Sequence, residues 1–157
     1  MPIAKGSAAL AIVAGGLIAG TVDLMQAFYL FGRKVPMSIA AGLLGTQALN
    51  GGAGTYLLGV LLHFFIATTF TAFYYAASRR RNFLAVYPLT CGLVYGVCVE
   101  LVMSYVVLPL SALHATGPYT LHDVLQGILV HMVTVGLPIA YSVSVLGTPV
   151  SKTSLKA

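Results

Sequence analysis

The sequence predicts an all-α membrane protein: a four-helix transmembrane bundle with a short interfacial or re-entrant helix between the first and second spans. Two facts of composition predict it, because 59% of the 157 residues are hydrophobic and only 7% are charged. Soluble domains are about 25% charged, so this chain needs a bilayer as its solvent. Its four long apolar stretches also lack the alternation that barrel strands require.

Each apolar stretch holds 20 or more mostly apolar residues. A helix of that length crosses a hydrocarbon core about 30 Å thick. The first stretch is longer than the core of a signal peptide, so we interpret it as a retained helix. We expect one transmembrane domain over residues 1–157, with spans at about 7–31, 55–77, 86–108 and 121–146.

The segment between the first two spans predicts a helix too short to cross the membrane, at about residues 36–49. Pro36 is typical of a helix start, and Asn50 followed by two glycines is typical of a helix end. Before the last span, Thr120 and Asp123 match a capping box, which predicts that they cap the fourth helix.

Basic residues lie at the ends of the spans, which is the pattern of membrane orientation. One side carries six Lys and Arg residues and the other carries only Arg33 and Lys34, which predicts that both termini are cytoplasmic. Three of the six form a cytoplasmic anchor between the second and third spans: Arg79, Arg80 and Arg81. The other three are the terminal lysines Lys5, Lys152 and Lys156. The short anchor segment predicts that the second and third spans are antiparallel neighbours. No patch of mixed aromatic and basic residues suggests nucleic-acid binding.

Each predicted span carries one ionisable residue in its interior: Asp23, His63, Glu100 and His131. Each lies about eight to ten residues from the non-cytoplasmic end of its span, roughly 12–15 Å at 1.5 Å per residue. Small residues share their helix faces, and such residues line helix contacts in membranes. The sequence therefore predicts an intramembrane polar layer that faces the bundle interior, which Gln26 and Ser104 could extend.

Several functions remain open for this layer. It could be structural glue between helices, or it could handle protons or a small solute, since carboxylates and imidazoles exchange protons near neutral pH. The same four residues are candidate ligands for a divalent cation or, less readily, a haem, although the Glu-x-x-His pairs of di-iron bundles are absent. No nucleophile motif or phosphate loop indicates an enzyme. A homo-oligomer or a partner subunit in the membrane is a further alternative.

Three stretches resemble the YagU-like bacterial inner-membrane proteins: "LLHFFIATTFTAFYYAASRR", "GLVYGVCVELVMSYVVLPLSAL" and "TLHDVLQGILVHMVTVGLP". The resemblance covers roughly the last two-thirds of the chain and matches His63 and His131. It implies a bacterial inner-membrane location and a helical architecture. It implies no particular activity or cofactor.

Overall fold

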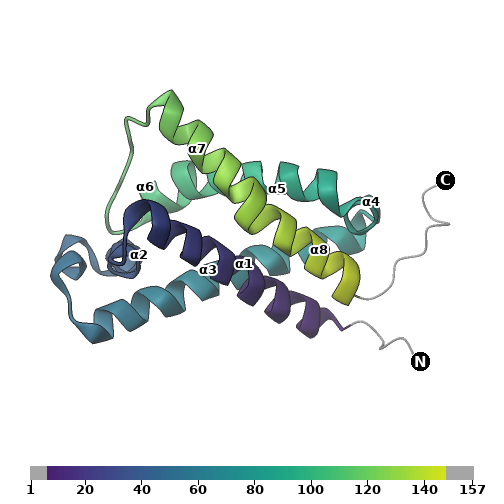
Figure 1. Ribbon diagram of the computed structural model, residues 1–157, viewed down its shortest axis with the longest axis horizontal. Helices are drawn as coiled ribbons and strands as arrows, with labels where there is room; N and C mark the ends of the chain where they lie inside the picture. Colours follow the sequence, from purple (N-terminus) through teal and green to yellow (C-terminus); the bar gives the residue numbers. More distant parts are fainter. Residues whose placement is uncertain (1–6, 148–157) are drawn as a thin grey trace.

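The computed structural model describes residues 7–147 and shows an all-α bundle, which confirms the predicted fold class (Figure 1). Within those residues no strand is present and four helical segments are long and apolar enough to cross a membrane. The segments run over Ala8–Phe31, Ala53–Arg80, Pro88–Leu110 and Leu121–Leu146. The predicted limits differ by up to three residues, chiefly because the second helix continues past its apolar part into the arginines.

The first two segments are the uninterrupted helices α1 (Ala8–Phe31) and α3 (Ala53–Arg80). The third comprises α5 (Pro88–Val102), the π-helical turn η2 (Met103–Val107) and α6 (Leu108–Leu110). The fourth comprises α7 (Leu121–His131), the π-helical turn η3 (Met132–Gly136) and α8 (Leu137–Leu146). Short helices join them: α2 (Val35–Leu44), η1 (Thr46–Asn50) and α4 (Phe83–Val86).

Two prolines account for the π-helical turns. Pro109 and Pro138 each follow their turn by two residues. Proline has no N–H to donate and its ring crowds the carbonyl four residues earlier, so a widened turn accommodates the chain before it. The chain before Pro138 therefore forms a π-helical turn, as does the chain before Pro109 in the third segment.

Helix α1 packs between α3 and α8, and α5 packs on η3, α7 and α8 (Figure 1). The second and third spans were predicted to be direct neighbours, but α4 lies in the connection between them and they meet mainly through two side chains. The rings of Tyr74 and Tyr95 contact edge to face with centroids 4.8 Å apart. A groove is left between α3 and α5 beside this contact.

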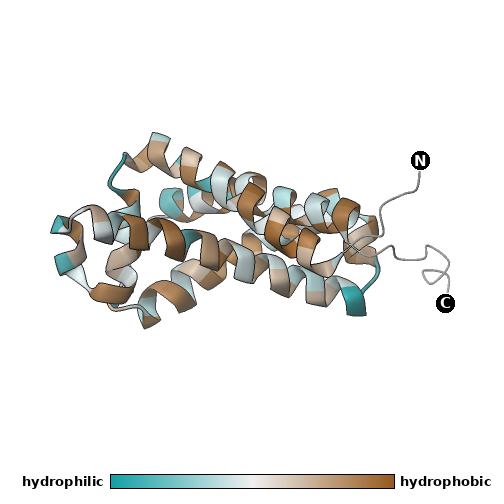
Figure 2. Cartoon of the chain, turned by 90° about the horizontal axis from the view of Figure 1, so that it is seen from below, coloured by the Kyte–Doolittle hydropathy of each residue, from teal (hydrophilic) through white to brown (hydrophobic). Residues whose placement is uncertain are grey.

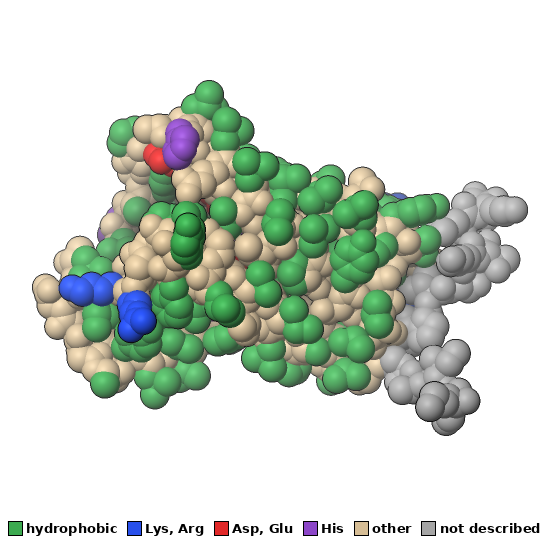
Figure 3. Space-filling view, viewed as in Figure 1, with side chains coloured by type: hydrophobic (Ala, Val, Ile, Leu, Met, Phe, Trp, Pro, Cys, Tyr) green, Lys and Arg blue, Asp and Glu red, His purple; other side chains and the backbone are tan. Residues whose placement is uncertain are grey.

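Large apolar side chains are exposed on all four segments. Figure 2 shows hydrophobic residues along the helices, and Figure 3 shows apolar side chains spread over the face in view. Phe65 is 69% exposed, Leu129 is 63% exposed and Val133 is 59% exposed. The buried core holds mainly smaller residues, among them Ala19, Val99 and Ala140. An apolar exterior around a core of small residues is the pattern of helices that contact lipid.

Glycines set the closest helix contacts. A Cβ atom on Gly96 of α5 would collide with the backbone of Met132, and one on Gly136 would collide with the carbonyl oxygen of Gly92. A Cβ on Gly59 of α3 would likewise overlap the carbonyl of Pro36, which shows how tightly α2 lies against α3. The glycines therefore allow backbone-to-backbone approach, as in other membrane bundles.

The substitution Gly96→Ala tests this packing. We expect it to destabilise the bundle by about 1–3 kcal/mol because neither backbone can move away easily. Thermal unfolding of the detergent-purified protein, followed by circular dichroism, measures the effect. Gly54→Ala in the first turn of α3 is the control, because a Cβ there meets no atom within 4 Å. Equal melting temperatures for the two variants would contradict the account.

Candidate functional site

A carboxylate and an imidazole meet between α5 and α7. His131 Nδ1 lies 2.9 Å from Glu100 Oε2 and 3.0 Å from the carbonyl oxygen of Gly127. A carbonyl only accepts hydrogen bonds, so Nδ1 carries a proton and donates it toward these two oxygens. Ser104 donates a hydrogen bond of 2.7 Å to Glu100 Oε1, and Glu100 is only 8% exposed. Both oxygens of this carboxylate therefore have partners.

Gly127 makes room for the Glu100 carboxylate. A Cβ atom at position 127 would lie 2.6 Å from Glu100 Cδ and Oε1. The predicted capping box starts α7 two turns earlier, where Asp123 N donates to Thr120 Oγ1 over 3.2 Å and Thr120 N donates to Asp123 Oδ2 over 3.1 Å. The cap fixes where the helix begins, and the glycine fixes how closely it approaches α5.

The second carboxylate, Asp23, lies between α1, α3 and η3. Thr134 donates a 2.7 Å hydrogen bond to Asp23 Oδ1, and His63 Nε2 lies 4.0 Å from Asp23 Oδ2. His63 Nε2 is also 2.8 Å from the carbonyl oxygen of Gly20, so this nitrogen carries a proton and donates it to Gly20. The His63 side chain, on α3, is therefore bonded to the α1 backbone one turn before Asp23. It lies close to the Asp23 carboxylate without being hydrogen-bonded to it.

The four residues form two pairs, and three of the four residues line a small cavity. Its volume is about 80 Å³, and Asp23, His63 and His131 line it with apolar residues from α2, α3, α5 and η3. A cavity needs only about 10–15 Å³ to hold one water molecule, so a few waters would fit here. The cavity places the two pairs within reach of each other through water.

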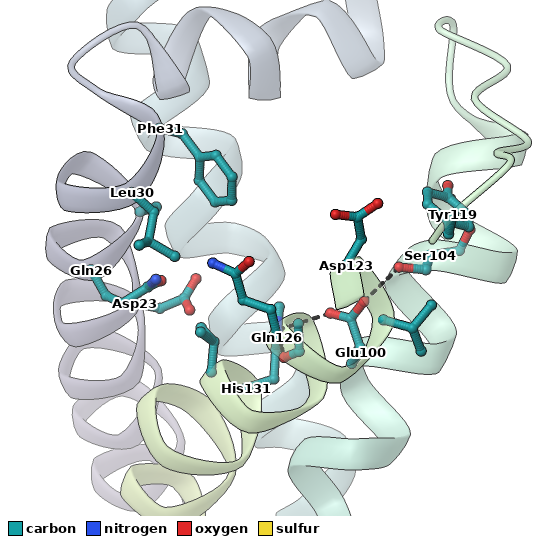
Figure 4. Close-up of a pocket in the computed structure, with 14 residues that line it drawn as sticks. Asp23, Gln26, Leu30, Phe31, Glu100, Ser104, Tyr119, Asp123, Gln126 and His131 are labelled. Atoms are coloured by element: carbon teal, nitrogen blue, oxygen red, sulfur yellow. Dashed lines mark hydrogen bonds and ion pairs between the residues drawn. The ribbon is translucent and has the colours of Figure 1, made fainter. Parts of the chain in front are cut away.

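A larger cavity of about 330 Å³ lies between α1, α5 and α7, as Figure 4 shows. All three acidic side chains of the protein line it: Asp23, Glu100 and Asp123. None of the described residues that line it is a lysine or an arginine. Asp23 and His131 line both cavities, so the two spaces meet at these side chains.

The larger cavity opens at the end of the bundle that carries α2 and the α6–α7 connection. Phe31 and Asp123, at its rim, have side chains that are exposed. Gln26 and Gln126 line its walls from α1 and α7, and in Figure 4 the Gln126 amide points across toward α1. Tyr119 completes the wall near α5, with its hydroxyl 3.3 Å from the Ser104 carbonyl oxygen. The access side thus combines apolar surface with carboxylate, amide and hydroxyl groups.

Apolar side chains close the opposite side. Phe70, Val99 and Val135 line the inner end of the small cavity. Behind them lies the main buried core, in which Tyr74 and Ile139 are almost completely buried. Among the described residues, the larger cavity therefore gives access to the carboxylates at one end of the bundle, and buried apolar side chains lie toward the other.

The charge of the cluster depends on protons. With neutral imidazoles, Asp23 and Glu100 carry two negative charges, and the described Lys and Arg residues lie at helix ends, outside both cavities. An unbalanced charge in a low-dielectric interior is costly, so the cluster favours states that hold two positive charges. Two protons would suffice, on either the imidazoles or the carboxyls. One proton and one bound cation would also balance the charge.

The remaining predicted residues have separate positions. Gln26 and Ser104 both line the larger cavity. In the arginine anchor, the Arg79 guanidinium lies 5.7 Å from the centre of the Tyr75 ring, whereas Arg80 and Arg81 are exposed. Lys5, Lys152 and Lys156, which support the predicted orientation, lie outside the described residues.

A metal site finds no geometric support. Across residues 7–147, no three His, Cys, Asp or Glu side chains lie in a group that could hold a metal ion. The carboxylate–imidazole contacts are pairwise, and in each pair the imidazole nitrogen nearest the carboxylate also lies within hydrogen-bond distance of a backbone carbonyl.

Sequence reasoning missed three contributors. Thr134 shares the His131 face of the fourth span, but it had no assigned role, and it is the residue that binds Asp23. Gln126 and Tyr119 were also missed, although both line the cavity. A local signal did exist in the shared pattern Met-x-x-Val-x-Leu-Pro at residues 103–109 and 132–138, which marks both π-helical turns.

Comparison with known proteins yields no relative: no family model, no curated protein and no solved structure matches the chain. The resemblance to the YagU-like proteins stays a prediction. The site must therefore be interpreted from its own chemistry.

Cysteine accessibility tests the one-sided opening. In a background with Cys91→Ser and Cys98→Ser, we expect Gln126→Cys to react with a membrane-impermeant maleimide added on one side of the membrane only. Val99→Cys, at the small cavity and only 2% exposed in the native side chain, should stay unreactive from both sides. Labelling of reconstituted protein, read by mass spectrometry, measures this. Val99→Cys reacting as fast as Gln126→Cys would contradict a closed inner end.

Proposed function

We propose that this chain is an integral membrane protein that exchanges protons, together with a small cationic solute, through the cavity between α1, α5 and α7. The observation that carries the proposal is the distribution of charge. The chain has three acidic residues and all three line this one cavity, whose lining within residues 7–147 includes no lysine or arginine. Ionisable residues at membrane depth commonly mark ion or substrate pathways.

The contents of the cavity support a solute as well as protons. A volume of about 330 Å³ is at the lower end of the range for small-molecule sites. Carboxylates supply charge, Gln26 and Gln126 supply amide groups, and Tyr119 supplies an aromatic ring. Such a lining suits an amine or another small cation, because binding it would balance the charge that Asp23 and Glu100 carry when deprotonated.

Proton exchange follows from the pairing. When His131 carries a proton on both ring nitrogens, its Nδ1 proton needs only a short transfer across the 2.9 Å contact to reach Glu100, and it leaves a neutral imidazole and a protonated carboxyl. Asp23 borders both cavities and can pass a proton by water toward His63. A cation entering from the open end would displace protons from these groups, which couples the two events.

The π-helical turns support a movable site. One lies directly after His131 and the other begins three residues after Glu100. Such turns occur often at functional sites, since their backbone bonds can shift between neighbouring partners. A shift at η2 or η3 would alter the distance between α5 and α7, and so the Glu100–His131 pair.

We further propose that the protein resides in a bacterial inner membrane with both termini in the cytoplasm. Support comes from the six-against-two distribution of Lys and Arg and from the YagU-like resemblance. In this orientation the cavity opens away from the cytoplasm. Two interpretations compete with this proposal: a purely structural cluster and a role as a partner subunit. Both predict that Glu100 is dispensable for transport.

Proton flux into liposomes tests the proposal. We expect reconstituted protein to dissipate an imposed pH gradient faster than empty liposomes, with valinomycin and potassium compensating charge and an internal pH dye as the readout. Glu100→Gln should return the rate to that of empty liposomes, because the amide cannot take up the His131 proton. His122→Gln is the control, since His122 is exposed and 82% of its side-chain surface is accessible.

Two results would contradict proton exchange. One is a Glu100→Gln rate equal to that of the unaltered protein. The other is a rate for the unaltered protein that stays at the empty-liposome value across a panel of added amines and inorganic cations. Either result would favour a structural role for the cluster.

A further inference from the structure

A second site lies on the other side of the molecule, in the groove between α3 and α5. Its volume is about 530 Å³, larger than that of the polar cavity. Residues of α3, α4 and α5 line it, including Tyr74, Phe83, Val94, Tyr95 and Cys98. No residue of the polar cluster lines it, so it is a separate feature of the molecule.

The groove presents hydrocarbon-like surface even where its residues are polar. The Tyr74 hydroxyl donates to the carbonyl oxygen of Leu84 over 2.8 Å, and the Tyr95 hydroxyl donates to that of Phe70 over 2.7 Å. Both hydroxyls are therefore turned onto the backbone, and the rings face the groove. A surface whose polar groups are already bonded favours an apolar occupant over water.

Positive charge lies at one end of this groove. Ala77 lines the groove, and the N–H of Arg81 donates to the Ala77 carbonyl oxygen over 2.9 Å, so Arg81 follows one turn along the same wall. Arg80 and Arg81 are exposed, whereas the Arg79 guanidinium lies over the Tyr75 ring. The three acidic side chains line the polar cavity, and no Asp or Glu is among the described residues that line the groove.

We propose that the groove is a binding site for an anionic phospholipid. One acyl chain lies between α3 and α5 against the tyrosine rings, and the phosphate and headgroup bind Arg80 and Arg81. The apolar groove and the basic end together match the two parts of such a lipid, and neither a water-soluble anion nor a zwitterionic lipid matches both. Basic residues next to a span attract anionic lipids. The bound lipid fills the space that α3 and α5 leave between them.

The absence of tryptophan from the sequence makes a sharp experiment available. Phe83→Trp places one fluorescent reporter at the groove rim, where Phe83 is 45% exposed. The variant is reconstituted in bilayers that contain equal fractions of phosphatidylglycerol and phosphatidylcholine, with only one of the two brominated. Bromine on the acyl chain quenches tryptophan on contact, so the quenching reports which lipid occupies the groove.

We expect brominated phosphatidylglycerol to quench Phe83→Trp more than brominated phosphatidylcholine, with an association constant about fivefold higher per arginine. Adding Arg80→Gln and Arg81→Gln should make the two lipids equal. The matched control Arg33→Gln and Lys34→Gln, at the opposite end of the bundle, should leave the preference unchanged. A second reporter, Phe65→Trp on the lipid-facing side of α3, should show no preference because Phe65 does not line the groove.

Three outcomes would overturn the proposal. Equal quenching by the two lipids at Phe83→Trp would show that the groove does not select an anionic headgroup. A preference for phosphatidylglycerol that survives Arg80→Gln and Arg81→Gln would show that these arginines do not bind the headgroup. Quenching by neither lipid means that a protein surface, such as a second copy, covers the groove. None of these results bears on proton flux, because Glu100 lies outside the groove.

Discussion

A carboxylate at membrane depth needs partners inside the protein, because lipid offers none and an unpaired charge is costly there. Glu100 has both oxygens bonded, to His131 and Ser104, and Asp23 is bonded to Thr134. These contacts bring together residues of the first, third and fourth segments. Close packing of those segments on their glycines makes the contacts possible.

The close approach of the helices depends on small residues and prolines. Gly127 leaves space for the Glu100 carboxylate, and Gly96 lets α5 touch the turn that follows His131. Pro138 and Pro109 widen the chain beside the two paired groups. Glycines and prolines, which supply no reactive group, thus shape the site. Its polar cavity faces one end of the bundle, and the apolar core lies toward the other.

The fold and the cluster differ in how far the sequence predicts them. Length and hydropathy of the spans predict four helices, because a bilayer permits few other structures. One ionisable residue per span, with glycines on the same face, also places Asp23 and His131 near one another. The partner choices are harder to predict. Thr134 and Gln126 reach the site through helix rotations that tertiary packing sets. The short connection between α3 and α5 suggests a tight hairpin, but it contains the helix α4.

The pairing of Glu100 with His131 is the claim on which the functional account depends. Glu100 is the only glutamate in the sequence, so a ¹³C-labelled glutamate carboxyl gives one signal. Solid-state NMR of the protein in lipid bilayers can measure its dipolar coupling to ¹⁵N-labelled histidine rings. We expect a strong coupling to one imidazole nitrogen, consistent with the 2.9 Å contact between His131 Nδ1 and Glu100 Oε2, which disappears in His131→Phe. No coupling to any ring, or a coupling that survives His131→Phe, would contradict the account.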